Sequence, residues 1–153
     1  MKQIEERLKE LNIQIPQPAK PLAAYIPAIK VDNYVYTSGQ LPFINGELKY
    51  KGKVGKEVSE EEAQEAAAIS ILNCLGAVQS VIGSLEEIDQ IVKLTVFVSS
   101  AESFTNQPKV ANGASELLQK IFDDKGEHTR SAVGVSELPL NAPVEIEMIV
   151  RVK

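Results

Sequence analysis

Hydrophobic positions recur at helical spacing in two long segments of the chain. The first opens at Ser59 with a Ser-x-x-Glu capping box and ends near Gly83. In the second, Pro108 stands where a helix can begin, and Lys125-Gly126 marks its end. The apolar positions are Ala68, Ile71, Leu72, Leu75, Val78 and Ile82 in the first segment, and Val110, Ala114, Leu117, Leu118 and Ile121 in the second. The spacing therefore predicts two amphipathic helices, each with one face to bury.

Segments rich in β-branched and aromatic residues predict five strands. Residues 26–38 hold two of them around the turn Asp32-Asn33, and residues 91–98, 130–137 and 143–152 supply the others. Asn45-Gly46 favours a further short hairpin. Along the last strand, Val144, Ile146, Met148, Val150 and Val152 share one face, and Glu145, Glu147, Ile149 and Arg151 share the other. Only the first of these faces is uniformly apolar, so we expect the second to meet another subunit.

The first 24 residues differ in character from the rest. Ile4, Leu8 and Leu11 stand among charges at helical spacing, and the prolines Pro16, Pro18 and Pro21 follow. We therefore predict an N-terminal helix and proline-rich arm over residues 1–24 and a single domain over residues 25–153. With three apolar residues to bury, this helix is expected to be dispensable for folding.

The order of elements predicts the fold class. It reads helix, β, β, α, β, α, β, β, and two helices that each bury one face need a sheet beneath them. We therefore expect an α+β sandwich with a mixed sheet and both helices packed on one face.

Composition excludes several classes of function. A net charge of -5 is the wrong sign for a protein that must neutralise many phosphates, so we expect no nucleic-acid partner. One cysteine and no secretory signal pattern lead us to expect a cytoplasmic protein. The apolar runs are interrupted before about 18 positions, so no membrane span is expected. With one histidine and one cysteine the chain cannot build a Cys/His zinc site, and no metal is expected.

Two residues stand out as candidates for chemistry. Arg130 is one of three arginines and opens a predicted strand, where a planar guanidinium could bind a carboxylate through two hydrogen bonds. The alternative interpretation is a surface arginine at a strand end. Glu145 lies inside a strand on the less apolar face, and its alternative is a solvated glutamate that the pattern does not separate from Glu147. His128 is interpreted as a polar loop residue, and Cys74 as buried packing.

Three blocks of residues resemble the YjgF/RidA family of reactive intermediate deaminases. They are Tyr25, then Thr37-Ser38-Gly39-Gln40-Leu41-Pro42, then the stretch from Arg130-Ser131 through Leu138-Pro139 to Val144-Glu145-Ile146-Glu147. Fourteen residues separate Arg130 from Glu145, as in the family. The resemblance implies a chorismate-mutase-like fold assembled as a homotrimeric barrel, with ligand clefts between subunits.

The resemblance also implies an activity and a set of roles. The activity is hydrolysis of 2-imino or 2-enamino acids to 2-oxo acids and ammonia without a cofactor. Arg130 would hold the substrate carboxylate, and Glu145 would orient or deprotonate the attacking water. Two residues, Tyr25 and Ser38, would line the cleft, and backbone groups of Gly39 and Ala132 would face the ligand.

Each of these assignments has an alternative. Without the resemblance, Tyr25 is a core or interface aromatic, Ser38-Gly39 a strand-end turn and Ala132 a packing residue. A non-catalytic binding protein for a small carboxylate metabolite would use the same cleft. Glu145 favours the enzyme, because a carboxylate beside a bound carboxylate only weakens binding. A ribonuclease or translation inhibitor ranks last, since the charge and the lone histidine make an RNA-cleaving site hard to build.

Overall fold

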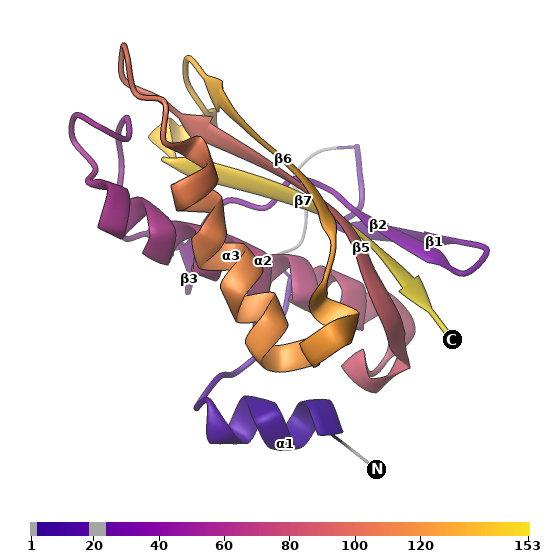
Figure 1. Cartoon of the computed structure of the whole chain (residues 1–153). Helices are drawn as coiled ribbons and strands as arrows, with labels where there is room; N and C mark the ends of the chain where they lie inside the picture. The colour runs from indigo at the N-terminus through magenta and orange to yellow at the C-terminus, as the bar shows by residue number, and fades with distance from the viewer. Residues whose placement is uncertain (1–2, 19–23) are drawn as a thin grey trace.

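Five strands pair into one mixed sheet in the order β1-β2-β7-β5-β6 (Figure 1). They are β1 (Ala28–Val31), β2 (Tyr34–Thr37), β7 (Val144–Val152), β5 (Ile88–Ser99) and β6 (Thr129–Val135). All neighbours are antiparallel except β5 and β6, which are parallel. This computed structural model describes residues 3–18 and 24–153. The end of the arm at 19–23, with Pro21, lies outside the described residues.

Two helices cover one face of this sheet, as predicted. The first, α2 (Glu60–Ile82), follows β2, and the second, α3 (Gln107–Phe122), makes the crossover that a parallel β5–β6 pair requires. A second small sheet pairs β3 (Phe43–Ile44) with β4 (Glu47–Leu48), which confirms the hairpin at Asn45-Gly46. The α+β class, the mixed sheet and the predicted order of three helices and five strands are therefore confirmed, with this hairpin added to the order.

The capping box at the start of α2 is present. The backbone N–H of Glu62 donates to Ser59 Oγ at 3.1 Å, and the N–H of Ser59 donates to Glu62 Oε1 at 2.9 Å. Gly83 ends the helix with a φ of 86°, a conformation that favours glycine. By length and composition alone, α2 is also long and apolar enough to cross a membrane, although the sequence pattern predicts no membrane span. Half of its most apolar window is buried inside the protein, as expected of a core helix.

The second helix ends earlier than its pattern predicts. After Phe122 the chain turns at Asp123, whose φ is 51°, into a 3-10 turn, η2 (Asp123–Gly126). Gly126 then lies so close to α3 that a Cβ there would stand 2.5 Å from the Leu118 carbonyl oxygen. This close approach fixes where the chain enters β6.

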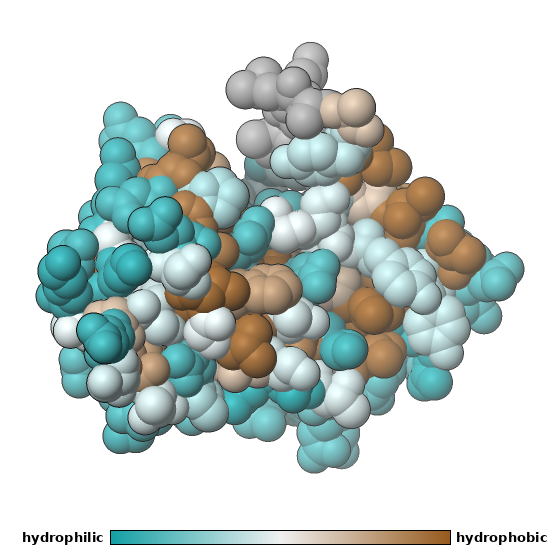
Figure 2. All heavy atoms as spheres, turned by 90° about the horizontal axis from the view of Figure 1, so that it is seen from above, coloured by the Kyte–Doolittle hydropathy of each residue, from teal (hydrophilic) through white to brown (hydrophobic). Residues whose placement is uncertain are grey.

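The alternation predicted along β7 is confirmed. Val144, Ile146, Met148, Val150 and Val152 are all buried under the helices. The opposite face of the sheet carries apolar side chains that are half exposed, among them Ile29 at 50%, Val31 at 52% and Tyr36 at 43%. Figure 2 looks onto this face and shows apolar side chains, in brown, among polar ones. We call it the open face.

The N-terminal helix α1 (Gln3–Glu10) lies beneath the helix layer, as Figure 1 shows. The carboxylate of Glu86, in the 3-10 turn η1 (Leu85–Glu87), accepts hydrogen bonds from the N–H groups of Ile4 at 2.8 Å and Glu5 at 3.1 Å. These bonds satisfy donors that a helix start leaves free. At the other end of α1, Arg7 donates to the Ile121 carbonyl oxygen and pairs with Asp123. Both ends of α1 are thus held by distant residues.

Apolar contacts continue from α1 into the arm. Ile4, Leu8, Ile13 and Ile15 pack against the core, while Leu11 is exposed, so the expectation that Leu11 is buried is wrong. The arm crosses α2 at Gly76, where a Cβ would stand 2.1 Å from the Pro16 carbonyl oxygen. Helices α2 and α3 therefore lie between the sheet and the N-terminal segment.

Candidate functional site

Arg130 points from β6 toward the helix layer. It stands opposite Leu94 of β5, a fully buried residue, and is itself half-buried. Its Nη1 donates to Asn112 Oδ1 at 2.9 Å and to Ser115 Oγ at 3.0 Å, both on α3. One nitrogen of the guanidinium is thus held by two neutral acceptors.

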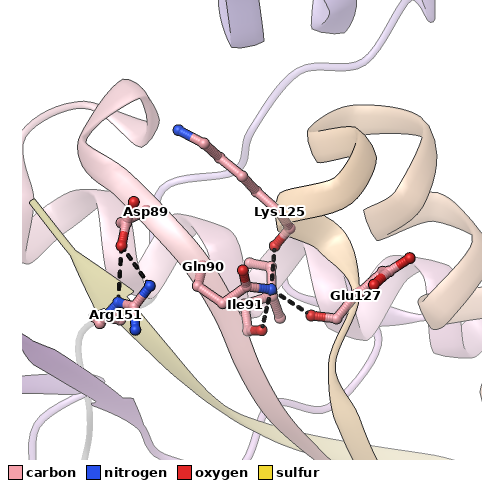
Figure 3. A network of polar contacts seen from close by, with 6 residues as sticks. All are labelled: Asp89, Gln90, Ile91, Lys125, Glu127 and Arg151. Carbon is pink, nitrogen blue, oxygen red and sulfur yellow. Dashed lines mark hydrogen bonds and ion pairs between the residues drawn. The ribbon is translucent and has the colours of Figure 1, made fainter.

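Arg130 differs from the other two arginines in having no acidic partner among the described residues. Arg7 pairs with Asp123, and Arg151 pairs with Asp89 (Figure 3). Within residues 3–18 and 24–153, Arg130 has no carboxylate in ion-pair range, and its Nε and Nη2 make no hydrogen bond. These two nitrogens form one planar edge that matches a carboxylate.

An open groove of about 560 Å³ adjoins this arginine. Besides Arg130, its lining comes from α3 and the loop before β6, and comprises Asn112, Ser115, Glu116, Gln119, Glu127 and His128. All of these residues are polar, so the groove suits a small charged or hydrogen-bonding ligand rather than an apolar one.

Glu145 lies on the open face, where it stands opposite Phe97 of β5. It is half-buried, and this burial raises the pKa of its carboxyl group. The neighbouring charge of Glu147 raises that pKa further. A Cβ at Gly39 would stand 2.5 Å from Glu145 Oε1, so the absence of a side chain at Gly39 makes room for the carboxylate.

The segment with Ser38 and Gly39 runs beside Glu145. Gln40 and Ile146 exchange backbone hydrogen bonds of 2.8 and 3.1 Å, which extends the pairing with β7 beyond β2. Ser38 Oγ donates to the Ile26 carbonyl oxygen at 2.7 Å, so this hydroxyl ties down the residues that follow Tyr25. Tyr25 itself is 57% exposed. Tyr25, Ser38, Gly39 and Glu145 make up what we call the Glu145 group.

Ala132 accompanies Arg130, not Glu145. It pairs with Val96 of β5 and packs, half-buried, against the core. Leu94 and Val96 point to the helix layer and Phe97 to the open face, because side chains alternate along a strand. The candidate residues therefore fall into two sets on opposite faces of the sheet: the Glu145 group, and Arg130 with Ala132. One chain alone does not bring them together.

The partners of Arg130 were not found from the sequence. Asn112 and Ser115 are three positions apart on α3 and so share a face of that helix. Two polar residues on the face directed at the sheet are the signal that could have revealed them. His128, interpreted as a loop residue, immediately precedes β6 and contacts Ser115.

The remaining groups do not add to a site. Cys74 is fully buried, and burial raises the pKa of its thiol to about 12, which keeps it protonated. Across the described part of the chain, no three His, Cys, Asp or Glu side chains gather in a way that could hold a metal ion.

Comparisons with known proteins agree with this architecture. The sequence model of the family described as "YjgF/chorismate mutase-like, putative endoribonuclease" matches residues 5–151. Protein TCP17 of Trypanosoma cruzi is 36% identical over 148 residues, which cover 96% of this chain and 92% of that protein. A 2-iminobutanoate/2-iminopropanoate deaminase of Dermatophagoides farinae is 33% identical over 138 residues, which cover 90% and 93%. The crystal structure of Atu1372 from Agrobacterium tumefaciens superposes with a TM-score of 0.91 and 40% identity, covering 99% of this chain and 94% of that one.

Proposed function

This chain belongs to the YjgF/chorismate mutase-like family, and on that premise we propose that it hydrolyses 2-imino and 2-enamino acids to 2-oxo acids and ammonia. The relative from Dermatophagoides farinae bears the name of this activity and is similar over nearly the whole length of both chains. The proposal extends that reaction class to this chain and leaves the substrate side chain open.

One observation carries the proposal, and it concerns Arg130. A half-buried arginine with two unbonded N–H groups on one edge, and no acidic partner in the described residues, is poised for an external carboxylate. Every 2-imino acid carries such a carboxylate next to the reacting carbon. Binding it at Arg130 would fix that carbon in position, which converts a collision with water into an oriented attack.

Glu145 supplies the base in this proposal. The ionised carboxylate would take a proton from water as the oxygen attacks the C=N carbon and pass it to the imine nitrogen, giving a carbinolamine. It would then take the hydroxyl proton of the carbinolamine and pass it to the nitrogen, so that the C=O bond forms as the C–N bond breaks and ammonia leaves. A carboxylate whose pKa is raised is a stronger base than an ordinary glutamate, which suits it to taking a proton from water.

The reaction requires a second chain, because Arg130 and Glu145 lie on opposite faces of the sheet. We propose a homotrimer in which the Glu145 group of one subunit completes the groove beside Arg130 of the next. The half-exposed apolar residues of the open face, such as Ile29 and Tyr36, support burial of that face between subunits. Light scattering at micromolar concentration should give three subunit masses, and a single subunit mass would refute the shared cleft.

The experiment measures ammonia released from imino acids generated freshly by an amino acid oxidase. The wild-type chain should accelerate release over buffer. Arg130→Lys should raise KM, since lysine keeps the charge and loses the two-pronged edge, and Glu145→Gln should lower kcat about a hundredfold. Arg151→Lys, which alters an arginine already paired with Asp89, is the matched control and should change neither.

The separation of the two groups also supports a second candidate, a carboxylate-binding protein without catalysis. Arg130 and its neutral partners serve binding by themselves within one chain. Ammonia release by the wild type and by Glu145→Gln decides between the two functions. In the enzyme, the wild type accelerates release and Glu145→Gln lowers turnover. In a binding protein, the wild type shows no acceleration with several imino acids and still binds a 2-oxo acid through Arg130.

A further inference from the structure

The hydrogen bonds behind Arg130 continue as a chain into the loop before β6. Arg130 Nη1 donates to Ser115 Oγ at 3.0 Å, and Ser115 Oγ lies 2.9 Å from His128 Nε2. On the far side of the ring, His128 Nδ1 lies 2.6 Å from the Gly126 carbonyl oxygen. Three side chains and one backbone group are thus linked in a row.

The partners determine the direction of every bond in this row. A carbonyl oxygen only accepts, so His128 Nδ1 must carry a hydrogen and donate it to Gly126. In the neutral ring Nε2 is then an acceptor, and the hydroxyl of Ser115 donates to it. The hydroxyl proton is thereby directed away from Arg130, and a lone pair of Ser115 Oγ faces the guanidinium. The imidazole therefore orients the serine as an acceptor for Arg130.

The loop that carries Gly126 is itself fastened to β5. The side-chain amide of Gln90 donates to the carbonyl oxygens of Lys125 at 3.2 Å and Glu127 at 2.6 Å, on either side of Gly126 (Figure 3). Gly126 also lies against α3 with no room for a side chain. The row of hydrogen bonds thus begins from a fixed backbone, which is what a positioning device needs.

We propose that Ser115 and His128 are positioning residues that fix the guanidinium of Arg130 for a substrate carboxylate. This inference rests on the proposed function and adds two residues to it. With Nη1 held, the free edge of Nε and Nη2 keeps one orientation in the groove. A carboxylate then binds without paying the rotamer entropy that a loose arginine would lose. Ser115 and His128 act through Arg130 and do not touch the substrate.

A nucleophilic role for Ser115 fits the geometry less well. A serine within hydrogen-bond reach of a histidine is the arrangement of a nucleophile and its base. Ser115 is 9% exposed, however, and its oxygen already accepts from Arg130. An acyl group would have to displace the guanidinium to reach it. The arrangement therefore favours positioning.

The test separates binding from turnover. Calorimetry with 2-oxobutanoate gives the Kd for a carboxylate, and ammonia release gives KM and kcat. Ser115→Ala removes the hydrogen bond to Arg130, and His128→Phe leaves the serine hydroxyl without its acceptor. Each should raise Kd and KM on the order of tenfold and leave kcat within about twofold. Ser115→Thr, which keeps the hydroxyl, should restore the wild-type Kd. Ser80→Ala removes a serine hydroxyl on α2, outside the groove and outside this row, and is the matched control.

Coupling to Arg130 distinguishes positioning from a general structural effect. In an Arg130→Ala background, neither Ser115→Ala nor His128→Phe should weaken 2-oxobutanoate binding further. An unchanged Kd in the folded single variants overturns the inference, as does covalent labelling of Ser115 by a fluorophosphonate. If the wild type releases no ammonia but binds 2-oxobutanoate with the expected variant effects, the inference stands and the proposed function fails. If the wild type is active and the variants bind and react as it does, the proposed function stands and the inference fails.

Discussion

Gly39→Ala should disable Glu145 without unfolding the protein. The new Cβ would stand 2.5 Å from Glu145 Oε1, 2.9 Å from its Cδ and 3.1 Å from its Cγ, whereas ordinary van der Waals contact begins at 3.4 Å. The carboxylate must therefore move by about 0.9 Å, the difference between the 2.5 Å contact and the 3.4 Å limit. The φ of Gly39 lies outside the left-handed region, so alanine itself fits the backbone.

The displaced atoms belong to the end of a flexible side chain, and this keeps the cost in stability small. A side chain pushed off its preferred rotamer costs about 1 kcal/mol, which for a domain of this size lowers Tm by roughly 3 °C. The effect on catalysis is larger, because misplacing a catalytic group by about 1 Å lowers the rate on the order of a hundredfold. We therefore expect kcat to fall between about thirtyfold and a hundredfold, equivalent to roughly 2 to 2.7 kcal/mol.

Ammonia release and thermal unfolding measure these two effects separately. A Glu145→Ala background is the control, because the methyl group then has no carboxylate to displace. In that background Gly39→Ala should lower kcat no further. A single variant with a kcat within twofold of the wild type would show that the position of the Glu145 carboxylate does not limit the reaction. A fall in Tm of 10 °C or more would show that the methyl group disturbs the backbone instead.

Three further predictions concern single side chains on the open face, in the N-terminal segment and in the core. Glu147→Gln removes a charge that raises the pKa of Glu145, so that pKa should fall and the acidic limb of the kcat/KM profile should move to lower pH; an unmoved limb contradicts the coupling. Leu8→Ala should lower the free energy of unfolding by about 1 kcal/mol, and Leu11→Ala by less than about 0.5 kcal/mol, in urea titrations, because only Leu8 packs on the core. Cys74, with a pKa of about 12 and full burial, should resist iodoacetamide at pH 8 until urea unfolds the chain, and rapid native labelling would refute its burial.

Local patterns in the sequence predicted local structure well. The capping box of Ser59 and Glu62 requires residues three positions apart, and the alternation along β7 requires only a strand with one buried face. Both signals are complete within a few residues. The α+β class followed from the order of such segments, and the family resemblance supplied the specific fold.

The features of the site that the sequence does not predict depend on residues that come into contact only after folding. Arg130 bonds to Ser115, fifteen positions away, and nothing in either local pattern indicates that α3 crosses β6 at that height. Opposite placement of Arg130 and Glu145 follows from the register of three strands. That register shifts within β5 between Ile88 and Gln90 and again between Ile91 and Lys93. Periodicity does not predict such irregularities, since each adds a residue to one strand alone.

The docking of α1 has a consequence for the order of events in biosynthesis. A helix of eight residues is marginal in water, so α1 needs its partners in order to form. Those partners are Glu86, 82 positions after Ile4, and Ile121, 114 positions after Arg7. The contacts of α1 therefore remain incomplete until α3 has been synthesised. The docking of α1 therefore completes only after both helices that cover the sheet have been made.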